Sequence, residues 1–345
     1  LLLLLEIDLA LKKNNLKNVD RRYFISTFAN MKSETLKGNL YAILSASTFG
    51  TIPLFSVPLM KAGFALPSVL IYRYAFGCIF MLAVLLLLKK NMRIDKKEAL
   101  EIAFCSLLYT ASSICLFEGY NYMPSGVATT LLFSYPVWTE LLLIIFVHEK
   151  LTLRISFAII FAVLGVSFLG GIANSTGAYP IQGVLFELGS GLCYAVYMVI
   201  FPRMKICRVP ALKVNFYIFI AAMLYLLIYS GITTGGIQRL DNWEACLSLI
   251  LLGLIPTTIS NLALVKAMRF TSSANVAILG AFEPLTAIII GIFLLGEPLT
   301  LSISIGIVLI IAAVSSLIIH GNKFLSYYKL SSLIFHKRHT KRNET

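Results

Sequence analysis

Carboxyl groups lie inside long apolar runs of this sequence, where a charge is costly and needs a specific reason. Glu283 stands in the middle of the apolar run 273–295 and directly precedes Pro284. A proline inside a helix frees backbone carbonyl groups and can open the helix locally. A carboxyl group at this depth could bind an ammonium group or exchange a proton, so Glu283 is the first candidate for the functional centre. The alternative is a structural glutamate that is protonated or hydrogen bonded.

Glu187 is the second candidate, because aromatic residues follow it at helical spacing. Glu187, Ser190, Tyr194 and Tyr197 are separated by three or four residues and share one face of a helix. A carboxylate beside two aromatic rings could hold an amine through its charge and through cation–π contact. Alternatively, the two tyrosines only pack between helices.

Other polar and aromatic residues within apolar runs extend the candidate site. Those predicted to line a cavity are Trp138, Tyr135, Asn261 and Thr48. Those predicted to act in coupling or as a gate are Glu140, Arg73 and Glu118. Arg73 and Glu118 stand at similar depth near one end of their runs, so they could form an ion pair. We also expect the Arg73 side chain to extend from the rim toward the aqueous surface.

Motifs for enzymatic or metal chemistry are missing from the sequence. The six cysteines form no CxxC pair, the four histidines form no HExxH motif, and no phosphate-binding P-loop occurs. We therefore predict no catalytic residues, no metal site and no cofactor, and we do not expect an enzyme.

Composition identifies the class of protein to which these residues belong. Of the 345 residues, 58% are hydrophobic and only 13% are charged, whereas soluble domains carry about 25% charged residues. Apolar runs long enough to cross a bilayer lie near 38–60, 68–88, 99–120, 124–147, 154–172, 181–201, 211–230, 244–265, 273–295 and 301–320. The sequence predicts an all-α polytopic membrane protein with ten transmembrane helices.

The positive charges indicate how these helices are oriented. Lys and Arg gather in both tails and in every second connection, where they include Lys89, Lys90, Arg93, Lys96, Lys97, Lys150, Arg154, Arg203, Lys205, Arg208, Lys213, Lys266 and Arg269. The remaining connections carry only Lys61 and Arg239. We therefore expect an integral, multi-pass protein of the plasma (inner) membrane. By the positive-inside rule, both of its termini are expected to face the cytoplasm. The net charge of +13 therefore reflects topology rather than nucleic-acid binding.

Both ends of the chain differ from the apolar runs. Residues 1–36 form a basic cytoplasmic N-terminal tail, and residues 321–345 form a basic cytoplasmic C-terminal tail. The sequence begins with Leu1 and its first methionine is Met31. We therefore expect residues 1–30 to be a non-native extension or a tail without fixed structure.

An internal repeat divides the apolar part of the chain. Residues 123–170 and 271–318 share 14 identities in 48 positions, among them Pro136 with Pro284 and Glu149 with Glu297. Each copy, 37–172 and 181–320, holds five apolar runs. Because five is odd, the second copy would enter the membrane from the opposite side. The chain is thus predicted to be two inverted five-helix repeats, an arrangement that supports alternating access.

These features resemble the EamA-type transporters of the drug/metabolite transporter superfamily. The resemblance is carried by the Pro-bearing run in each copy, by the Glu149-Lys150-Leu151-Thr152 and Glu297-Pro298-Leu299-Thr300 connections, and by Ser125 and Ser273 at the starts of matching runs. The resemblance implies a secondary transporter that lies in the lipid bilayer, has a central cavity and carries a small-molecule substrate. Tyr135 stands where the second copy has Glu283, so the predicted cavity is not symmetric in charge.

Substrate class follows from the charges of the candidate residues. Glu283, Glu187 and Glu140 are set against one intramembrane base, Arg73. This balance favours zwitterionic or cationic metabolites, such as amino acids or amines, over phosphates, and Glu283 could couple their exit to protons. We expect an exporter or exchanger, as a monomer or a homodimer, and no nucleic-acid partner. The alternative is a non-transporting membrane scaffold or a lipid scramblase.

Overall fold

The computed structural model describes residues 21–89, 91–147, 153–169, 179–271, 276 and 279–318, and all regular secondary structure in these ranges is helical. Its first half contains α2 (Arg21–Phe49), α3 (Ile52–Lys61), α4 (Leu66–Leu87), α5 (Lys96–Gly119), α6 (Ser125–Leu132), α7 (Tyr135–Val147) and α8 (Leu153–Leu169). Its second half contains α9 (Ile181–Ile200), the short turns η1 (Phe201–Arg203) and η2 (Lys205–Arg208), α10 (Ala211–Thr233), α11 (Trp243–Leu252), η3 (Gly253–Ile259), α12 (Ser260–Phe270), α14 (Phe282–Leu294) and α15 (Leu301–Ile318).

Length and composition support the predicted membrane class. Seven helical segments of the described chain are long and apolar enough to cross a bilayer, and three shorter apolar helices cover Ile159–Leu169, Phe282–Leu294 and Leu301–Ala313. The all-helical membrane fold is therefore confirmed, whereas the number of ten spans stays a prediction. The tail prediction falls largely on residues 1–20 and 321–345, which lie outside the described residues, while residues 21–36 belong to α2.

Proline breaks several of the apolar runs. Pro53 lies in the first turn of α3, just after α2 ends, and Pro136 lies in the first turn of α7, after the turn at Phe133 and Ser134. Pro256 lies inside η3, a π-helical turn in which the Thr257 and Thr258 hydroxyl groups donate to the carbonyl groups of Leu252 and Gly253, each at 2.9 Å. These bonds satisfy acceptors that the distorted turn would otherwise leave open.

The position of Pro284 within its helix differs from the prediction. It occupies the first turn of α14 rather than the interior of a helix, because α14 begins at Phe282 after a turn at Gly280. The missing N–H of a proline costs little at this position. Glu283 therefore stands at the start of a helix, next to a break in the run, and not in the middle of a continuous helix.

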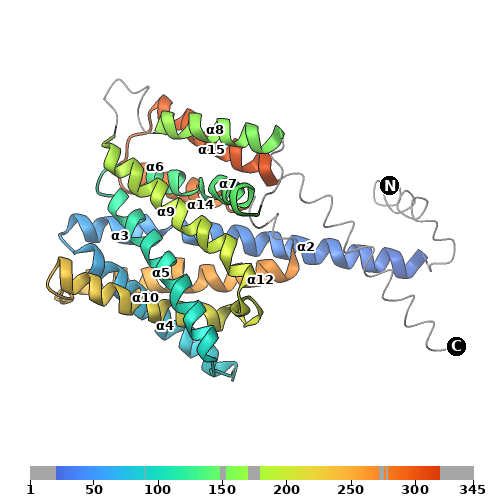
Figure 1. Cartoon of the computed structure of the whole chain (residues 1–345), viewed down its shortest axis with the longest axis horizontal. Helices are drawn as coiled ribbons and strands as arrows, with labels where there is room; N and C mark the ends of the chain where they lie inside the picture. Colours follow the sequence, from blue (N-terminus) through green and yellow to red (C-terminus); the bar gives the residue numbers. More distant parts are fainter. Residues whose placement is uncertain are drawn as a thin grey trace.

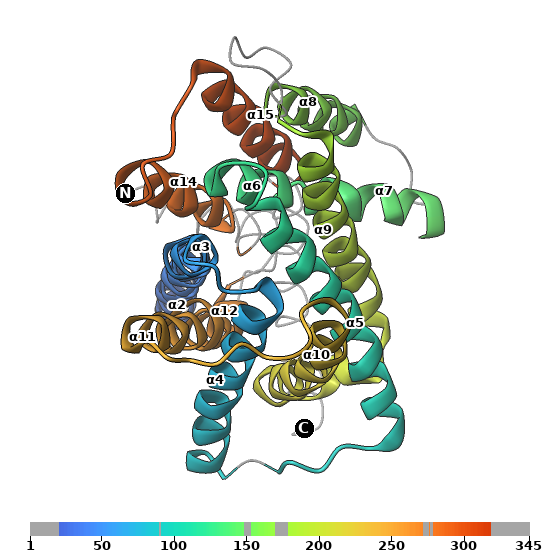
Figure 2. The ribbon, with the colours of Figure 1, turned by 90° about the vertical axis from the view of Figure 1, so that its left-hand side faces the viewer.

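Helix pairing is reciprocal between the two halves. The last helices of the halves, α8 and α15, pack together, as do α4 with α10 and α6 with α14. α2 packs on α12, and α9, which begins the second half, packs on α5 of the first half. Figure 1 shows these pairs side by side, and the end-on view in Figure 2 shows α8 and α15 at one edge of the bundle with α4 and α10 toward the opposite edge.

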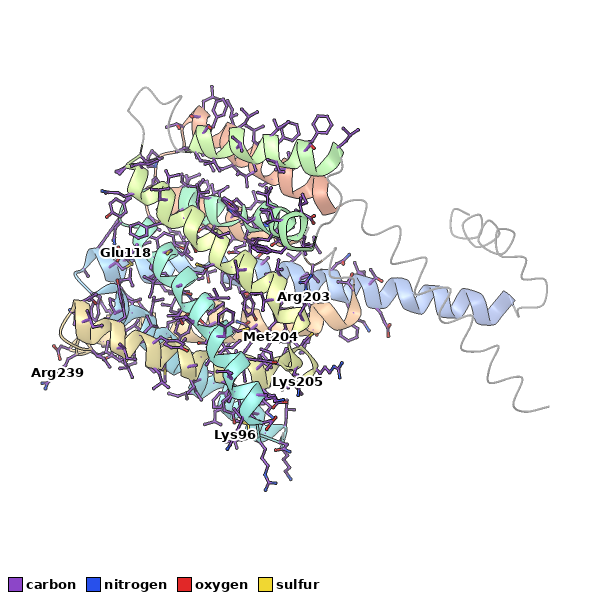
Figure 3. The ribbon with its side chains drawn as sticks, in the orientation of Figure 1. Lys96, Glu118, Arg203, Met204, Lys205 and Arg239 are labelled. Atoms are coloured by element: carbon purple, nitrogen blue, oxygen red, sulfur yellow. The ribbon has the colours of Figure 1, made fainter. Side chains whose placement is uncertain are left out.

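Connections from different halves meet at the same end of the bundle. Near the end of α3, the Ala65 N–H donates to Gln238 Oε1 at 2.9 Å, and the Tyr72 hydroxyl donates to the Gln238 carbonyl at 2.9 Å. At the other end, the Tyr217 hydroxyl donates to the Met92 carbonyl at 2.5 Å. Figure 3 shows Lys96, Arg203 and Lys205 toward the end from which α2 projects, whereas Glu118 and Arg239 lie toward the opposite end.

Candidate functional site

Tyrosine rings from four helices meet between the two halves of the bundle. Tyr194 packs edge-on against Tyr135 with ring centroids 4.8 Å apart, and it stacks on Tyr197 at 5.9 Å. Tyr109 lies 6.5 Å from Tyr194 and 6.3 Å from Tyr197 between ring centroids. Tyr74 continues the group at 6.2 Å from Tyr109. We call these five residues, from α4, α5, α7 and α9, the tyrosine cluster.

Members of the tyrosine cluster keep some accessible surface. Tyr109, Tyr135, Tyr194 and Tyr197 are half-buried, whereas Tyr74 is fully buried and shares a hydrogen bond of 2.6 Å with Ser113. Among the described residues, the hydroxyl groups of Tyr109, Tyr135 and Tyr194 have no hydrogen-bond partner. Such hydroxyl groups can donate to or accept from a ligand.

Glu283 faces this cluster from α14. Its carboxyl group is close enough to act electrostatically on Tyr109, Tyr135 and Tyr194. Gly50, between α2 and α3, lies against the backbone of Glu283, and a Cβ atom there would overlap the Glu283 carbonyl oxygen. The absence of a side chain at Gly50 therefore lets the broken first run approach the start of α14.

Arg73 supplies the positive charge of the site. Its side chain is 1% exposed, and its Nε atom donates to the Thr257 hydroxyl at 3.0 Å. The guanidinium carbon lies 5.8 Å from the Phe49 and Phe117 ring centroids and 5.6 Å from that of Tyr74. Arg73 also acts electrostatically on Glu283. The expectation that Arg73 extends from the rim toward the aqueous surface is wrong, because rings and the π-helical turn enclose it.

An ion pair between Arg73 and Glu118 is not formed in this conformation. Glu118 instead accepts a hydrogen bond of 3.1 Å from the Asn121 side chain at the end of α5. Within the described part of the chain, the terminal nitrogen atoms of Arg73 have no hydrogen-bond acceptor. The guanidinium group therefore keeps donors for a ligand.

Glu187 lies on the face of α9 that packs against α5. On the same face, the Ser190 hydroxyl donates to the Ser112 carbonyl at 2.7 Å, and Tyr194 and Tyr197 contact Tyr109. Glu187 is fully buried, and neither carboxyl oxygen has a hydrogen-bond partner among the described residues. It therefore belongs to the same helix face as the tyrosine cluster but lies nearer to the start of α9.

The remaining predicted residues are less closely tied to the tyrosine cluster. Thr48 donates to carbonyl groups of its own helix, at 2.7 Å to Leu44 and 3.0 Å to Ser45. Asn261 donates to the Thr257 carbonyl at 2.6 Å and accepts from Asn215 at 3.1 Å. Of these bonds, the one between Asn215 and Asn261 joins the broken eighth run to α10.

Trp138 and Glu140 are both half-buried on α7. A Cβ atom added at Gly191 of α9 would lie 3.5 Å from the Trp138 ring. Trp138 therefore packs close to α9, one turn of helix from the end of the tyrosine cluster at Tyr135.

Two cluster members, Tyr74 and Tyr109, were not among the predicted site residues. A signal for Tyr109 exists in the sequence, because Ser106, Tyr109 and Ser113 lie along one side of the apolar run 99–120 at spacings of three and four. Within the ranges that the structure describes, no three His, Cys, Asp or Glu side chains gather as metal ligands would. Glu283, Arg73 and the tyrosine cluster together offer one carboxyl group, one guanidinium group and several phenol groups.

Solved structures and curated relatives resemble this chain over most of its length. A crystal structure superposes with a TM-score of 0.59 at 18% identity, covering 85% of this chain and 99% of the other, which supports the fold alone. An uncharacterized transporter of Archaeoglobus fulgidus is 27% identical over 280 residues, which are 80% of this chain and 94% of the relative. The threonine/homoserine exporter RhtA of Escherichia coli K12 is 24% identical over 235 residues, which are 68% of this chain and 75% of the relative.

A family model places these likenesses in one group. The model of the EamA-like transporter family matches residues 36–171 and again residues 181–319, so two copies of the family unit cover most of the chain. The resemblance noted in the sequence is confirmed. This chain belongs to the EamA-like transporter family.

Proposed function

We propose that the protein is a secondary transporter that exports or exchanges a zwitterionic amino acid. The observation that carries this proposal is the joint presence of Glu283 and Arg73 beside the tyrosine cluster. An amino acid carries one ammonium group and one carboxylate. The carboxyl group of Glu283 is suited to the ammonium group, and the guanidinium group of Arg73 is suited to the carboxylate.

Several features of the site support this assignment over other solutes. Within the described residues, the terminal nitrogen atoms of Arg73 donate no hydrogen bond. They can therefore bind a carboxylate without first breaking one. The tyrosine rings add cation–π contact to an ammonium group and hydroxyl groups for a polar side chain. The ammonium group of a purely cationic amine would gain an interaction with Glu283. The amine has no carboxylate for Arg73, so the buried guanidinium charge would stay unpaired and binding would be weaker.

Relatives favour the same class of solute. The printed name of RhtA assigns it threonine and homoserine, both of which are zwitterions at neutral pH. The identity of 24% does not transfer that substrate to this chain. It does make threonine and homoserine the first solutes to test.

The mechanism would be alternating access between two inverted five-helix repeats. Reciprocal pairing of α4 with α10, of α6 with α14 and of α8 with α15 is the pattern expected for two halves related by a two-fold axis. The grouping of connections at the two ends of the bundle supports ten alternating crossings. The site lies between the halves, where a rocking motion would expose it to one side at a time.

The test is uptake of radiolabelled L-threonine and L-homoserine by proteoliposomes that contain the purified protein. We expect saturable flux, and we expect competition from other zwitterionic amino acids but not from organic phosphates or from the matching decarboxylated amines. Competition led by the amines would move the assignment to cationic metabolites. Lipid scrambling without solute flux would favour the scramblase alternative, and neither activity would favour a scaffold.

Two substitutions connect the flux to the site. Glu283→Gln and Arg73→Gln each remove one charge-assisted interaction, worth about 1.5–3 kcal/mol, so transport affinity should fall roughly 10- to 100-fold. Glu118→Gln is the matched control, because this carboxyl group bonds Asn121 outside the tyrosine cluster. Unchanged affinity in both site variants would contradict the assigned roles.

A further inference from the structure

Glu187 differs from every other carboxyl group in the described chain by its complete enclosure. Its side chain is 0% exposed, and both carboxyl oxygens lack a hydrogen-bond partner among the described residues. Gly119 of α5 makes this position possible, because a Cβ atom there would overlap the Glu187 carboxyl group. The carboxyl group therefore occupies a slot that a glycine leaves open between α9 and α5.

Ionisation of such a group is strongly disfavoured. A buried carboxylate without a partner loses its hydration and gains nothing in return, whereas the protonated acid loses much less. Arg73 acts on Glu283 but has no comparable effect on Glu187. The enclosure therefore favours the neutral, protonated form of this carboxyl group in the present conformation.

Among the residues that the structure describes, no charged partner for Glu187 comes from the elements packed around it. From α5 and the turn after it, Cys115 and Tyr120 interact electrostatically with Glu187, and Glu118 also acts on Cys115. α6 contains no titratable residue, and on α9 itself the nearest is Cys193, which faces Cys115. From α7, Tyr135 belongs to the tyrosine cluster, seven positions along α9 near Tyr194. These groups are phenols, thiols and one carboxyl group. None of them is a cation, and none donates a hydrogen bond to Glu187, so none stabilises a negative charge there.

The position of Glu187 links it both to the bundle surface and to the substrate site. It lies six residues after the start of α9 at Ile181, which is roughly 9 Å along a helix. The exposed Ile181 and the Glu118 end of α5 mark the end of the bundle that we assign to the outside. In the other direction, Tyr120 interacts electrostatically with both Glu187 and Glu283.

We propose that Glu187 is a proton-binding site, separate from the amino-acid site at Glu283 and Arg73, and that it carries protons inward as the amino acid moves outward. α5 and α9 belong to different halves, so relative motion of the halves would open the slot at Gly119 and admit water to the carboxyl group. The proton would bind from the outside and leave when the slot faces the cytoplasm. This proposal rests on the proposed amino-acid transport for its coupling, but not for the protonated state of Glu187.

The transport test separates coupling from substrate binding. Proteoliposomes would be assayed with L-threonine in two modes: exchange of internal for external threonine at equal pH, and net flux driven by a pH gradient. Glu187→Gln mimics the protonated acid, so exchange should stay within about twofold of the parent while acceleration by the gradient is lost. Glu118→Gln should keep both modes, and Glu283→Gln should lose both.

Two results in this assay would overturn the proposal. Gradient-driven flux in Glu187→Gln equal to that of the parent would show that the proton travels elsewhere. Loss of exchange as well, in a protein that elutes as a single folded species, would show that Glu187 binds substrate or holds the structure. Glu187→Asp keeps a titratable group and should retain part of the gradient response, which a purely structural role would not predict.

A spectroscopic test does not depend on any transported solute. Infrared difference spectra of the purified protein between neutral and strongly alkaline pH should contain the carbonyl band of a protonated carboxyl group. That band should shrink in Glu187→Gln but not in Glu118→Gln. A band of unchanged amplitude in Glu187→Gln would refute the protonated state, whereas a shrunken band without threonine flux would support it and leave only the proposed substrate contradicted.

Discussion

Glu297 illustrates at the residue scale how one carboxylate connects the two halves. Its Oε1 atom accepts from the Ser125 N–H at 2.7 Å, and its Oε2 atom accepts from the Gly126 N–H at 3.3 Å. These N–H groups have no partner within α6 because they lie in its first turn, where the helix dipole also favours a negative charge. Gly291 leaves room for the carboxylate, and Gly296, with φ of 67°, lets the chain turn toward it.

Removing this contact should weaken the fold measurably. Glu297→Ala leaves the start of α6 without its cap, which typically costs about 0.5–2 kcal/mol, and Glu297→Gln should cost less because one acceptor remains. Thermal unfolding of the purified protein in detergent would measure the difference. Glu244→Ala is the control, because this exposed acid lies at the start of α11. A control as destabilised as Glu297→Ala would contradict the cross-half cap.

Sequence reasoning at this scale predicted two acids inside the bundle, where the structure has them, and misplaced the base. Glu283 and Glu187 were identifiable because a carboxyl group is rare inside an apolar run. Arg73 was placed at the rim, because its depth was judged from the end of its own run. Its burial depends on Thr257, Phe49 and Phe117, which come from parts of the chain whose proximity to Arg73 the sequence does not state.

At the element scale, glycines set how closely the last helices of the two halves pack. A Cβ atom at Gly306 of α15 would lie 2.6 Å from Leu169 Cγ and 3.0 Å from the Gly165 carbonyl oxygen. A Cβ atom at Gly165 of α8 would lie 2.8 Å from Ile310. Small residues at a helix crossing allow backbones to approach, and such contacts supply much of the packing energy within a membrane.

Gly306→Ala should therefore push α8 and α15 apart. Overpacking of this kind costs about 1–3 kcal/mol, which outweighs the roughly 1 kcal/mol gain in helix propensity. Gly189→Ala on α9 is the matched control, because a Cβ atom there has open space around it. The melting temperature in detergent should fall for Gly306→Ala and stay level or rise for Gly189→Ala; the same change in both would refute the packing argument.

Breaks in helices mark the limit of sequence prediction for the elements. The long apolar runs reappear as helices with shifted ends, since hydropathy over a window averages across interruptions. Pro284 indicated a local opening of its run, but the start of α14 at Phe282 and the π-helical turn at Gly253–Ile259 were not predicted. The π-helical turn depends on the Thr257 and Thr258 hydroxyl groups, which satisfy the carbonyl groups of Leu252 and Gly253.

At the scale of the whole molecule, the inverted arrangement predicts opposite sides for equivalent positions of the two halves. Ala62 follows the first helix of the first half, and Cys207 follows the first helix of the second half. Lys97 and Arg239 stand near the connections after the second helix of each half. All four residues are exposed. An inverted repeat requires each pair to be split across the membrane, whereas a parallel duplication would place both members of a pair on the same side.

Labelling with a membrane-impermeant maleimide distinguishes these arrangements. In a background that lacks the other native cysteines, Ala62→Cys and Arg239→Cys should react in intact cells that express the protein. Native Cys207 and Lys97→Cys should react only after the membrane is permeabilised, because the Lys- and Arg-rich connections are expected in the cytoplasm. Hydrogen bonding of Gln238 to Ala65 and Tyr72 already ties the first connection to the one that carries Arg239. If Ala62→Cys and Cys207 reacted from the same side, the halves would not be inverted, and alternating access by exchange of equivalent repeats would lose its structural basis.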